Sequence, residues 1–371
     1  MSFPLVRELV ALAGRYKMRD AIIVSGFTWE THNVPERLAL ALARTGRRIL
    51  YCERPVSVLR HSSRELREVE TGLFVFTPKF YSARLSSFSL LVRYQGKMVA
   101  RQILEKALKL NLKDPLFIYP HGAFWLPVCR EFNKRGFCMV YICMDYEPPL
   151  SIEHVQQADL TLAIPEIVFR ELTQTFGNKI RRIPQFASRD NVDLSGPREK
   201  LHGLLRIPRP RIAYLGNLSG RVSIQLVNEL LVEHPEWQFV SFGSTTKWLP
   251  LANEHVLPWY SQNQMPAVLE ALDVGFMPYD CTDPKNLHCV PLKLFDYFSR
   301  GIPVVSTPIV HLREYHNLVY VGATAKELAD AVSHALVEPA GSPKRAARMA
   351  VARKHSIETL SGPISRVLEE A

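Results

Sequence analysis

Apolar and polar positions along the chain follow two alternating patterns. Short runs of apolar, β-branched and aromatic residues are typical of buried strands, as in "AIIVSGF" from residue 21. Each run is followed by a stretch with apolar residues three and four positions apart, as in "PERLALALARTG" from residue 35. That spacing is typical of an amphipathic helix. The alternation predicts βαβ units, and therefore parallel sheets covered by helices.

The alternation lapses once, between residues 188 and 210, where Pro, Gly and charged residues dominate. We therefore predict a first domain over residues 1–187, a linker over 188–210 and a second domain over 211–342. A length of 371 residues also favours two domains over one. For the last predicted helix, from about residue 343 to 371, we consider a return to the first domain.

Both predicted domains have the pattern of a Rossmann-like, doubly wound α/β fold. Two such domains are expected to face each other across a cleft. Ligands of open α/β sheets bind just outside the carboxyl ends of the strands. The loops that follow predicted strands are therefore where binding and catalytic residues are expected.

In the second domain, the first predicted strand ends in "YLGNLSGRVS", from residue 214. Gly216 and Gly220 free the backbone, and a helix begins a few residues later. A glycine turn that feeds a helix N-terminus can hold a phosphate, because free N–H groups and the helix dipole point at it. Arg221 is a candidate cation partner. The alternative is an ordinary tight turn between strand and helix.

Two further strands of the second domain end in candidate donor-site loops. Gly243 follows the second strand, in "SFGSTTKW", in a place equivalent to that of Gly216. "PWYSQNQMP" follows the third strand and offers Trp259 and Tyr260, which could lie beside a flat base. For Trp259 we prefer ordinary hydrophobic packing, and we take Tyr260 as the candidate.

The stretch "PLKLFDYFSRGIPVVSTPI", residues 291–309, predicts a helix, a sharp turn and a buried strand. Pro291 suits the start of the helix. Lys293 lies in the first turn, where the helix dipole disfavours a cation unless an anion sits in front of it. Asp296, on the same face, could accept two ribose hydroxyls. The alternative is a helix with one weak ion pair.

The same stretch resembles the signature of GT-B glycosyltransferases of the group 1, family 4-like type. "ALDVGFMPYD", "EHVLPWYSQNQMPAVL" and "RIAYLGNLSGRVS" are similar to neighbouring segments of that family. "QQADLTLAI" with "KIRRIPQFAS" resembles the end of its N-terminal domain. In the first half, "RRILYCERPVS" and "CMVYICMDY" look like bacterial members that build exopolysaccharide or teichuronic-type polymers.

The resemblance implies a glycosyltransferase, EC 2.4, whose C-terminal domain holds a nucleotide-sugar donor, with UDP as the preferred nucleotide. It implies no cofactor and no metal, since helix dipoles and cations neutralise the diphosphate. By position, Gly216 and Asn217 would line the phosphates and Lys293 would face the diphosphate. Asp296 would bind the ribose, and Leu294 belongs to the same donor-binding stretch.

One position departs from the family pattern. Many members carry two acidic residues eight positions apart, and here His288 stands where the first would be, with Asp296 as the second. His288 is kept as a donor-site candidate. Two other functions stay open: a nucleotide-sugar epimerase on the same fold, and a membrane-associated partner that has lost turnover.

The first domain should bind the acceptor, and its strand-following loops offer candidates. An inverting transfer needs a general base to take the proton of the acceptor hydroxyl. Asp145 is the first choice, because it follows a predicted strand, and His32 is the second. Trp29, Glu30 and His121 lie in similar loops and are expected on the acceptor side. The alternatives are a loop cap for Asp145 and a surface position for His32.

The net charge of +10 is concentrated in the first half. Residues 1–200 hold 30 Lys and Arg against 20 Asp and Glu, which accounts for the whole surplus. Eight of these cations, with one Glu and interleaved aromatic residues, lie in residues 79–113. Such a segment is typical of a surface that binds anionic membranes. The alternative is the solvated face of an ordinary helix, and no nucleic-acid-binding module accompanies the charge.

The remaining features bear on location. The six cysteines form no CxxC pair and mostly lie in apolar runs, which predicts reduced thiols and no metal site. The N-terminus lacks the continuous apolar core of a signal peptide. We therefore expect a cytoplasmic enzyme, peripheral on the inner face of the membrane, that acts on a lipid-linked glycan in surface polysaccharide synthesis.

Overall fold

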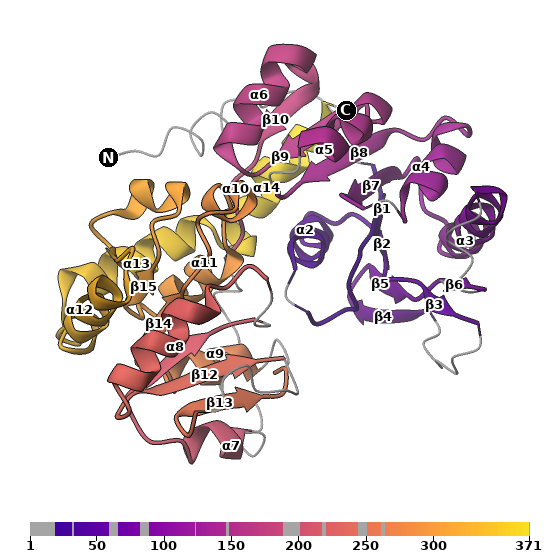
Figure 1. Ribbon diagram of the computed structural model, residues 1–371. Coiled ribbons are helices and arrows are strands. Elements are labelled where there is room, and N and C mark those ends of the chain that lie inside the picture. The colour runs from indigo at the N-terminus through magenta and orange to yellow at the C-terminus, as the bar shows by residue number, and fades with distance from the viewer. Residues whose placement is uncertain are drawn as a thin grey trace. The chain divides into compact units, whose positions relative to one another are not determined.

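A computed structural model describes residues 19–31, 33–58, 66–81, 89–122, 124–145, 148–187, 201–216, 220–243, 251–260 and 264–370. The chain divides into two compact units, drawn together in Figure 1. The first unit contains Met1–Gln185 and Ile357–Ala371, and the second contains Phe186–Ser356. Each unit has its own sheet and its own hydrophobic core. Of the predicted linker, residues 188–200 lie outside the described part.

The first unit is built on a sheet of eight strands in the order β10-β9-β8-β7-β1-β2-β5-β4. These are β1 (Ala21–Val24), β2 (Ile49–Cys52), β4 (Arg67–Glu70), β5 (Leu73–Phe76), β7 (Leu116–Pro120), β8 (Met139–Cys143), β9 (Leu160–Ala163) and β10 (Ile180–Arg182). All neighbours are parallel except β4 and β5. A separate two-stranded sheet pairs β3 (Val56–Ser57) with β6 (Lys79–Phe80). The central strands are buried on both faces, as parallel strands covered by helices should be.

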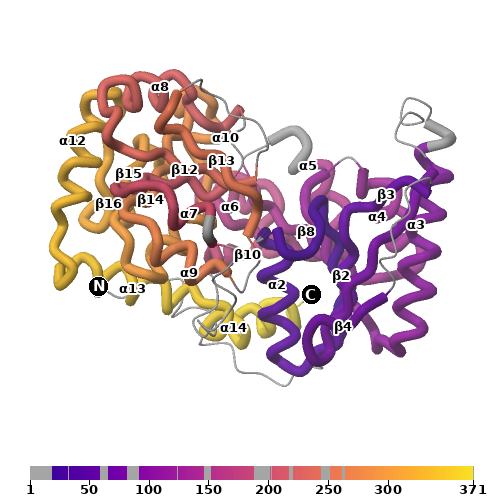
Figure 2. The backbone as a smooth tube through the Cα atoms, turned by 90° about the horizontal axis from the view of Figure 1, so that it is seen from below, coloured from indigo at the N-terminus to yellow at the C-terminus, as the bar shows by residue number. Residues whose placement is uncertain are grey.

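Helices cover this sheet and carry most of the remaining chain of the unit (Figures 1 and 2). They are α2 (Val34–Ala43), α3 (Ser89–Lys109), α4 (Leu126–Asn133), α5 (Pro148–Gln157), α6 (Glu166–Phe176), the short η2 (Gly177–Lys179) and α14 (Ile357–Glu369). The buried face of α3 carries Val99, Ile103 and Ala107. The predicted amphipathic spacing is therefore what attaches this basic helix to the core.

The second unit has six parallel strands in the order β13-β12-β11-β14-β15-β16. They are β11 (Arg211–Tyr214), β12 (Gln238–Phe242), β13 (Glu254–Leu257), β14 (Val274–Met277), β15 (Val304–Ser306) and β16 (Val319–Val321). The helices are α7 (His202–Leu205), α8 (Ile224–Glu233), α9 (Met265–Glu270), α10 (Pro284–Leu287), α11 (Leu292–Ser299), η5 (Val310–Tyr315), α12 (Ala325–Leu336) and α13 (Pro343–Lys354).

Each sheet has one point where the strand order reverses. In the first unit the chain runs outward from β1 to β2 on one side and from β7 to β10 on the other. In the second unit the corresponding pair is β11 and β14. Loops that leave two such strands diverge, and the space between them is where ligands of open α/β sheets bind. The order therefore selects one crevice in each unit.

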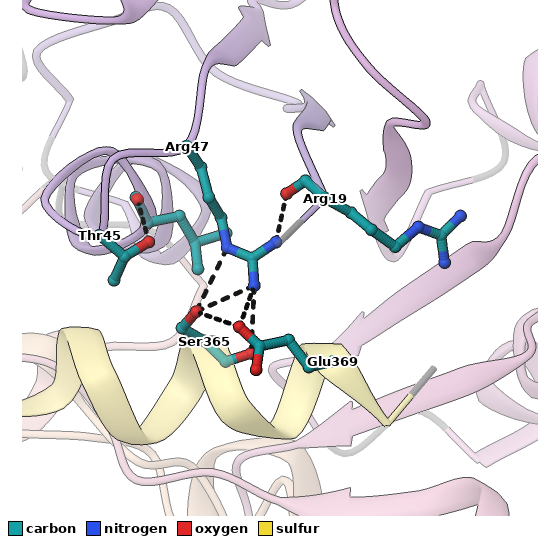
Figure 3. Close-up of polar contacts among 6 residues, drawn as sticks. Arg19, Thr45, Arg47, Ser365 and Glu369 are labelled. Atoms are coloured by element: carbon teal, nitrogen blue, oxygen red, sulfur yellow. Dashed lines mark hydrogen bonds and ion pairs between the residues drawn. The ribbon is translucent and has the colours of Figure 1, made fainter. Parts of the chain in front are cut away.

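The C-terminal helix α14 belongs to the first unit, where it packs beside α2 (Figure 2). Figure 3 shows how Arg47 anchors it. The guanidinium, with no exposed surface, donates to Ser365 Oγ at 2.9 Å and pairs with Glu369 at 3.0 Å. It also donates to the backbone carbonyl of Arg19. Because a buried guanidinium needs all of these partners, the anchor fixes the position of α14 on this unit.

The predicted C-terminal helix is two helices in the structure. α13 packs on α11 in the second unit, and Arg348 there donates to the carbonyl oxygen of Gly301 at 3.0 and 3.1 Å. Only the segment from Ile357 onward lies with the first unit. His355 caps α13 as its last helical turn ends. A break at this point separates the part of the segment that returns from the part that does not.

Candidate active site

Lys293 lies at the crevice of the second unit, beside the strands β11 and β14. It comes from the first turn of α11, and its amine donates to Tyr279 Oη at 3.0 Å and to Tyr214 Oη at 3.2 Å. The amine also lies 4.3 Å from the centre of the Tyr214 ring. No carboxylate is paired with it among the described residues. A cation held only by neutral hydroxyls and an aromatic face keeps its charge available for an anion.

The two tyrosines come from the ends of neighbouring strands. Tyr214 is the last residue of β11, and Tyr279 follows β14 and forms a β-bridge with Val222. Both rings are buried, and burial raises the pKa of Tyr279 well above its usual range. The phenols therefore stay neutral at any physiological pH and accept the amine's hydrogen bonds without cancelling its charge.

A third tyrosine holds α11 against the sheet. Tyr297 Oη donates to the carbonyl oxygen of Ala213 at 2.7 Å and accepts from the N–H of Leu215 at 2.9 Å. Its ring packs directly over Gly275 of β14, where any side chain would overlap the ring. The absence of a side chain at Gly275 thus lets α11 approach closely, and this approach brings Lys293 to the strand ends.

The glycine turn after β11 meets Lys293. Gly216 has φ of 144°, and a Cβ placed there would lie 3.7 Å from Lys293 Nζ and 3.3 Å from the Tyr214 ring. Glycine is therefore required both by the backbone and by the approach of the side chains. The carbonyl oxygen of Arg221 accepts from the N–H of Asp280 at 2.9 Å, which ties this turn to the loop after β14. Asn217 lies outside the described residues.

The loops after β12 and β13 pack an indole against a glycine. Gly243, with φ of 94°, lies in direct contact with the Trp259 ring. Trp259 is 43% exposed, whereas Tyr260 is 6% exposed and packs edge-on against Phe242. The sequence analysis preferred Tyr260 as the candidate and packing for Trp259. The structure exposes the indole and covers the phenol.

The other residues predicted on this stretch differ in accessibility. His288 is half-buried at the C-terminal end of α10, and its N–H donates to the carbonyl of Pro284 at 3.1 Å. The Leu294 side chain has no exposed surface, so only its backbone is in a position to meet a ligand. Asp296 is 4% exposed. The structure thus brings Gly216 and Lys293 together, while Asp296 and Leu294 are mainly buried.

In the first unit, the loop after β1 is held by buried carboxylates. Trp29 donates its N–H to Glu53 Oε1 at 2.8 Å, and its ring packs edge-on against Tyr51 at 5.0 Å. Glu53 has no exposed surface and also accepts from the Thr77 hydroxyl. Glu30 is exposed, with φ of 71°. His32 lies outside the described residues, so its predicted role as base stays a prediction.

The loop after β7 contains a cluster of two histidines. His121 Nδ1 lies 3.5 Å from Tyr141 Oη, and its ring meets His154 edge-on at 5.2 Å. His154 has no exposed surface, stacks on Tyr141 at 4.9 Å and accepts from the N–H of Gly122 at 3.4 Å. Burial first, and then His121, lower the pKa of His154 to about 4. His154 is therefore neutral at physiological pH.

Asp145 follows β8, as predicted, and is half-buried. Its backbone carbonyl accepts a hydrogen bond from Cys143 Sγ at 3.5 Å. β8 is one strand farther from the reversal point than β7. His121 therefore lies in a loop that borders the crevice, and Asp145 lies one strand beyond it.

The predicted basic segment is partly described. Arg93, Lys97 and Arg101 are exposed on α3. Near them, Tyr81 and Tyr94 are 47% and 56% exposed, and their rings stack at 6.3 Å with 15° between the planes. Residues 82–88 lie outside the described part. The described surface combines exposed aromatic rings with three cations.

Two general searches complete the description. Within the described ranges, no group of three or more His, Cys, Asp or Glu is placed to hold a metal ion. No helix in those same ranges is long and apolar enough to cross a membrane.

The two sheets and their reversal points define the GT-B fold, and solved structures agree. Sucrose-phosphate synthase from Thermosynechococcus elongatus matches with a TM-score of 0.66 at 12% identity, covering 95% of this chain and 98% of that chain. The UDP-forming α,α-trehalose-phosphate synthase from Burkholderia xenovorans, in complex with glucose-6-phosphate, matches with a TM-score of 0.65 at 14% identity, covering 94% and 100%. The predicted fold class is confirmed.

The family comes from sequence. Residues 209–338 match the model of glycosyl transferases group 1. The second unit is thus a group 1 glycosyltransferase domain, as its signature predicted. TuaH of Bacillus subtilis (strain 168), named as a glycosyltransferase of teichuronic acid biosynthesis, is 28% identical over 104 residues. That alignment spans about a quarter (26%) of each protein.

Several residues of the two crevices were missed from sequence. Tyr214, Tyr279 and Glu53 each end or follow a strand, but they were taken as parts of apolar runs. His154 lies inside a helix that carried no motif. The signal that could have found the tyrosines is their position at the ends of the two strands that flank the reversal point. That position needs the strand order, which one sequence does not give.

Proposed function

We propose that the protein transfers a sugar from a nucleoside-diphosphate donor, held by the second unit, to a lipid-linked glycan acceptor, held by the first. The single observation that carries the donor half is the amine of Lys293. It lies at the reversal point of a group 1 glycosyltransferase domain, beside a glycine turn and without a paired carboxylate among the described residues. A diphosphate placed there would gain the charge-assisted contact that the amine lacks.

The proposal includes independence from a divalent metal. Leaving-group charge develops on the diphosphate when the bond to the sugar breaks. Lys293 and the backbone N–H groups near Gly216 would neutralise that charge. Transfer should therefore continue at full rate in excess EDTA. A loss of activity that added Mg²⁺ or Mn²⁺ restores would overturn this part.

The proposal also includes peripheral binding to an anionic membrane. The support is the described surface of α3 and β6, where exposed tyrosines lie among Arg93, Lys97 and Arg101. Each cation near an anionic leaflet contributes about 1 kcal/mol, and tyrosine suits the interface. Reversal of these three cations to Glu should abolish sedimentation with phosphatidylglycerol vesicles. Binding that survives the reversal would remove this surface from the role.

The first experiment is thermal stabilisation by UDP, GDP, dTDP and CMP. A ligand present at a hundred times its dissociation constant adds roughly 2.7 kcal/mol to the free energy of unfolding. One diphosphate should raise the melting temperature of the wild type. Lys293→Ala should weaken its binding at least about tenfold, the scale of one charge-assisted contact.

Lys326→Ala is the matched control for this experiment. Lys326 lies in the same unit, 88% exposed and paired with Asp330, so its removal should leave nucleotide affinity unchanged. Equal affinity in Lys293→Ala and the wild type would overturn the diphosphate assignment. A wild type that no nucleotide stabilises would favour a partner protein without turnover.

A further inference from the structure

The crevice of the first unit displays an aromatic ring on a rigid loop. Phe27 follows β1 and is 51% exposed. Its N–H donates to Ser25 Oγ at 3.1 Å, and its carbonyl accepts from the N–H of Arg54 at 3.1 Å. Two residues on, the N–H of Trp29 is held by the buried Glu53. An exposed apolar ring whose backbone is fixed on both sides is preorganised for contact with a ligand.

The rest of this loop is fixed in the same way. The Thr31 hydroxyl donates to the carbonyl of Thr28 at 2.8 Å, and the Thr31 N–H donates to Glu36 Oε2 at 3.1 Å. Glu36 has no exposed surface. Two buried carboxylates, Glu36 and Glu53, therefore hold one loop from opposite ends. The loop cannot collapse over Phe27 without breaking these bonds.

The loops around this crevice are acidic, although their unit is basic. Residues 25–36, 121–127 and 144–152 follow β1, β7 and β8 and contain no Lys or Arg. They contain four carboxylates: Glu30, Glu36, Asp145 and Glu147. The coulombic effect of Glu36 and Glu53 also contributes to the raised pKa of Tyr51 beneath the loop. A phosphate group in this crevice would meet repulsion from several carboxylates and no cation from these loops.

We propose that the reacting end of the acceptor is an uncharged sugar ring that packs on Phe27. This inference rests on the proposed function and names the substrate class of its acceptor site. The apolar C–H face of a pyranose ring would lie on the phenyl ring, and carboxylates would accept hydrogen bonds from its hydroxyls. The relative in complex with glucose-6-phosphate carries a phosphate on its bound sugar. Here the carboxylates disfavour such a ligand.

This acceptor class has a consequence for the reaction sequence. If the reacting end is a neutral sugar, any anionic carrier of the glycan lies at least one sugar away from the crevice. An earlier glycosyl transfer must then have placed that sugar on the carrier. The protein would extend a glycan that has already been started.

The test compares neutral glycosides with sugar phosphates on the full chain. Saturation-transfer NMR with methyl glucoside, methyl galactoside and methyl N-acetylglucosaminide should show contact with the wild type. Their 6-phosphates should show at least about fivefold weaker binding. Phe27→Ala should weaken the glycosides about fivefold, the scale of one aromatic contact. Leu108→Ala, at a 79% exposed position of the same unit, should change nothing.

The outcomes are separable from those of the donor site. Tighter binding of the 6-phosphates, glycoside signals equal in Phe27→Ala and wild type, or no glycoside signal at all would each overturn the acceptor class. None of these results bears on the nucleotide shift that Lys293→Ala tests. Conversely, a wild type without nucleotide binding leaves the glycoside comparison intact. A change seen in Leu108→Ala as well would assign the signals to nonspecific contact and overturn the role of Phe27.

Discussion

The two crevices occupy equivalent places in two similar sheets, yet their charges are opposite. In the second unit, the loops after β11 and β14 surround an amine held by phenols. In the first, the loops after β1 and β7 surround an exposed phenyl ring and buried carboxylates. The parallel sheet determines where a ligand binds in each unit. The residues placed in the loops determine which charge that ligand carries.

The largest expected effect breaks the first crevice alone. Glu53→Ala would leave the Trp29 N–H and the Thr77 hydroxyl without their buried acceptor. We expect a loss of about 3 kcal/mol in the free energy of unfolding of the first unit, measured by urea denaturation. Nucleotide affinity of the second unit should stay unchanged. Glu105→Ala, on the exposed face of α3, is the control and should be neutral.

The second effect is a pH dependence of the first unit. The pKa of His154 is lowered from 6.5 to about 4 in the folded chain, so the unfolded chain binds the extra proton first. Stability should be complete above pH 6.5 and fall as the pH drops toward 4, by up to about 1.4 kcal/mol for each pH unit. Urea denaturation between pH 4 and pH 8 measures the slope.

His154→Gln separates this histidine from the other titrating groups. Gln keeps an acceptor near the N–H of Gly122 but carries no proton in this range. The variant should be less pH-dependent than the wild type by about one proton's worth of slope. Identical slopes in the two proteins would contradict the assignment to His154.

The smallest expected effect sharpens the second crevice. Tyr279→Phe removes one of the two hydroxyls that accept from Lys293 but keeps the ring. Donor affinity should fall by about threefold to tenfold, the scale of one hydrogen bond, because the amine is held less firmly. Calorimetric titration with the stabilising nucleotide measures it. An unchanged affinity would mean that Tyr214 alone positions the amine.

The fold was largely predictable, because strand and helix alternate with clear apolar periodicity. The chain pairing Gly216 with Lys293 was also predictable, since the signature helix carries its cation in an unfavourable place. The exposure of Trp259 and the burial of Tyr260 were not, because adjacent aromatic residues give no sign of which one faces the core. The division between α13 and α14 was missed for a related reason: both helices have apolar faces, and the sequence does not tell which unit each face covers.

The Arg47 anchor has a consequence for synthesis on the ribosome. The first unit needs residues 357–371, whereas the second unit lies wholly between residues 186 and 356. In the order of translation, the donor half is therefore complete in sequence before the acceptor half. Until the last residues emerge, Arg47 lacks Ser365 and Glu369 and remains a cation without its partners. A nascent chain should thus gain its nucleotide-binding half while its older, N-terminal half still waits for its final helix.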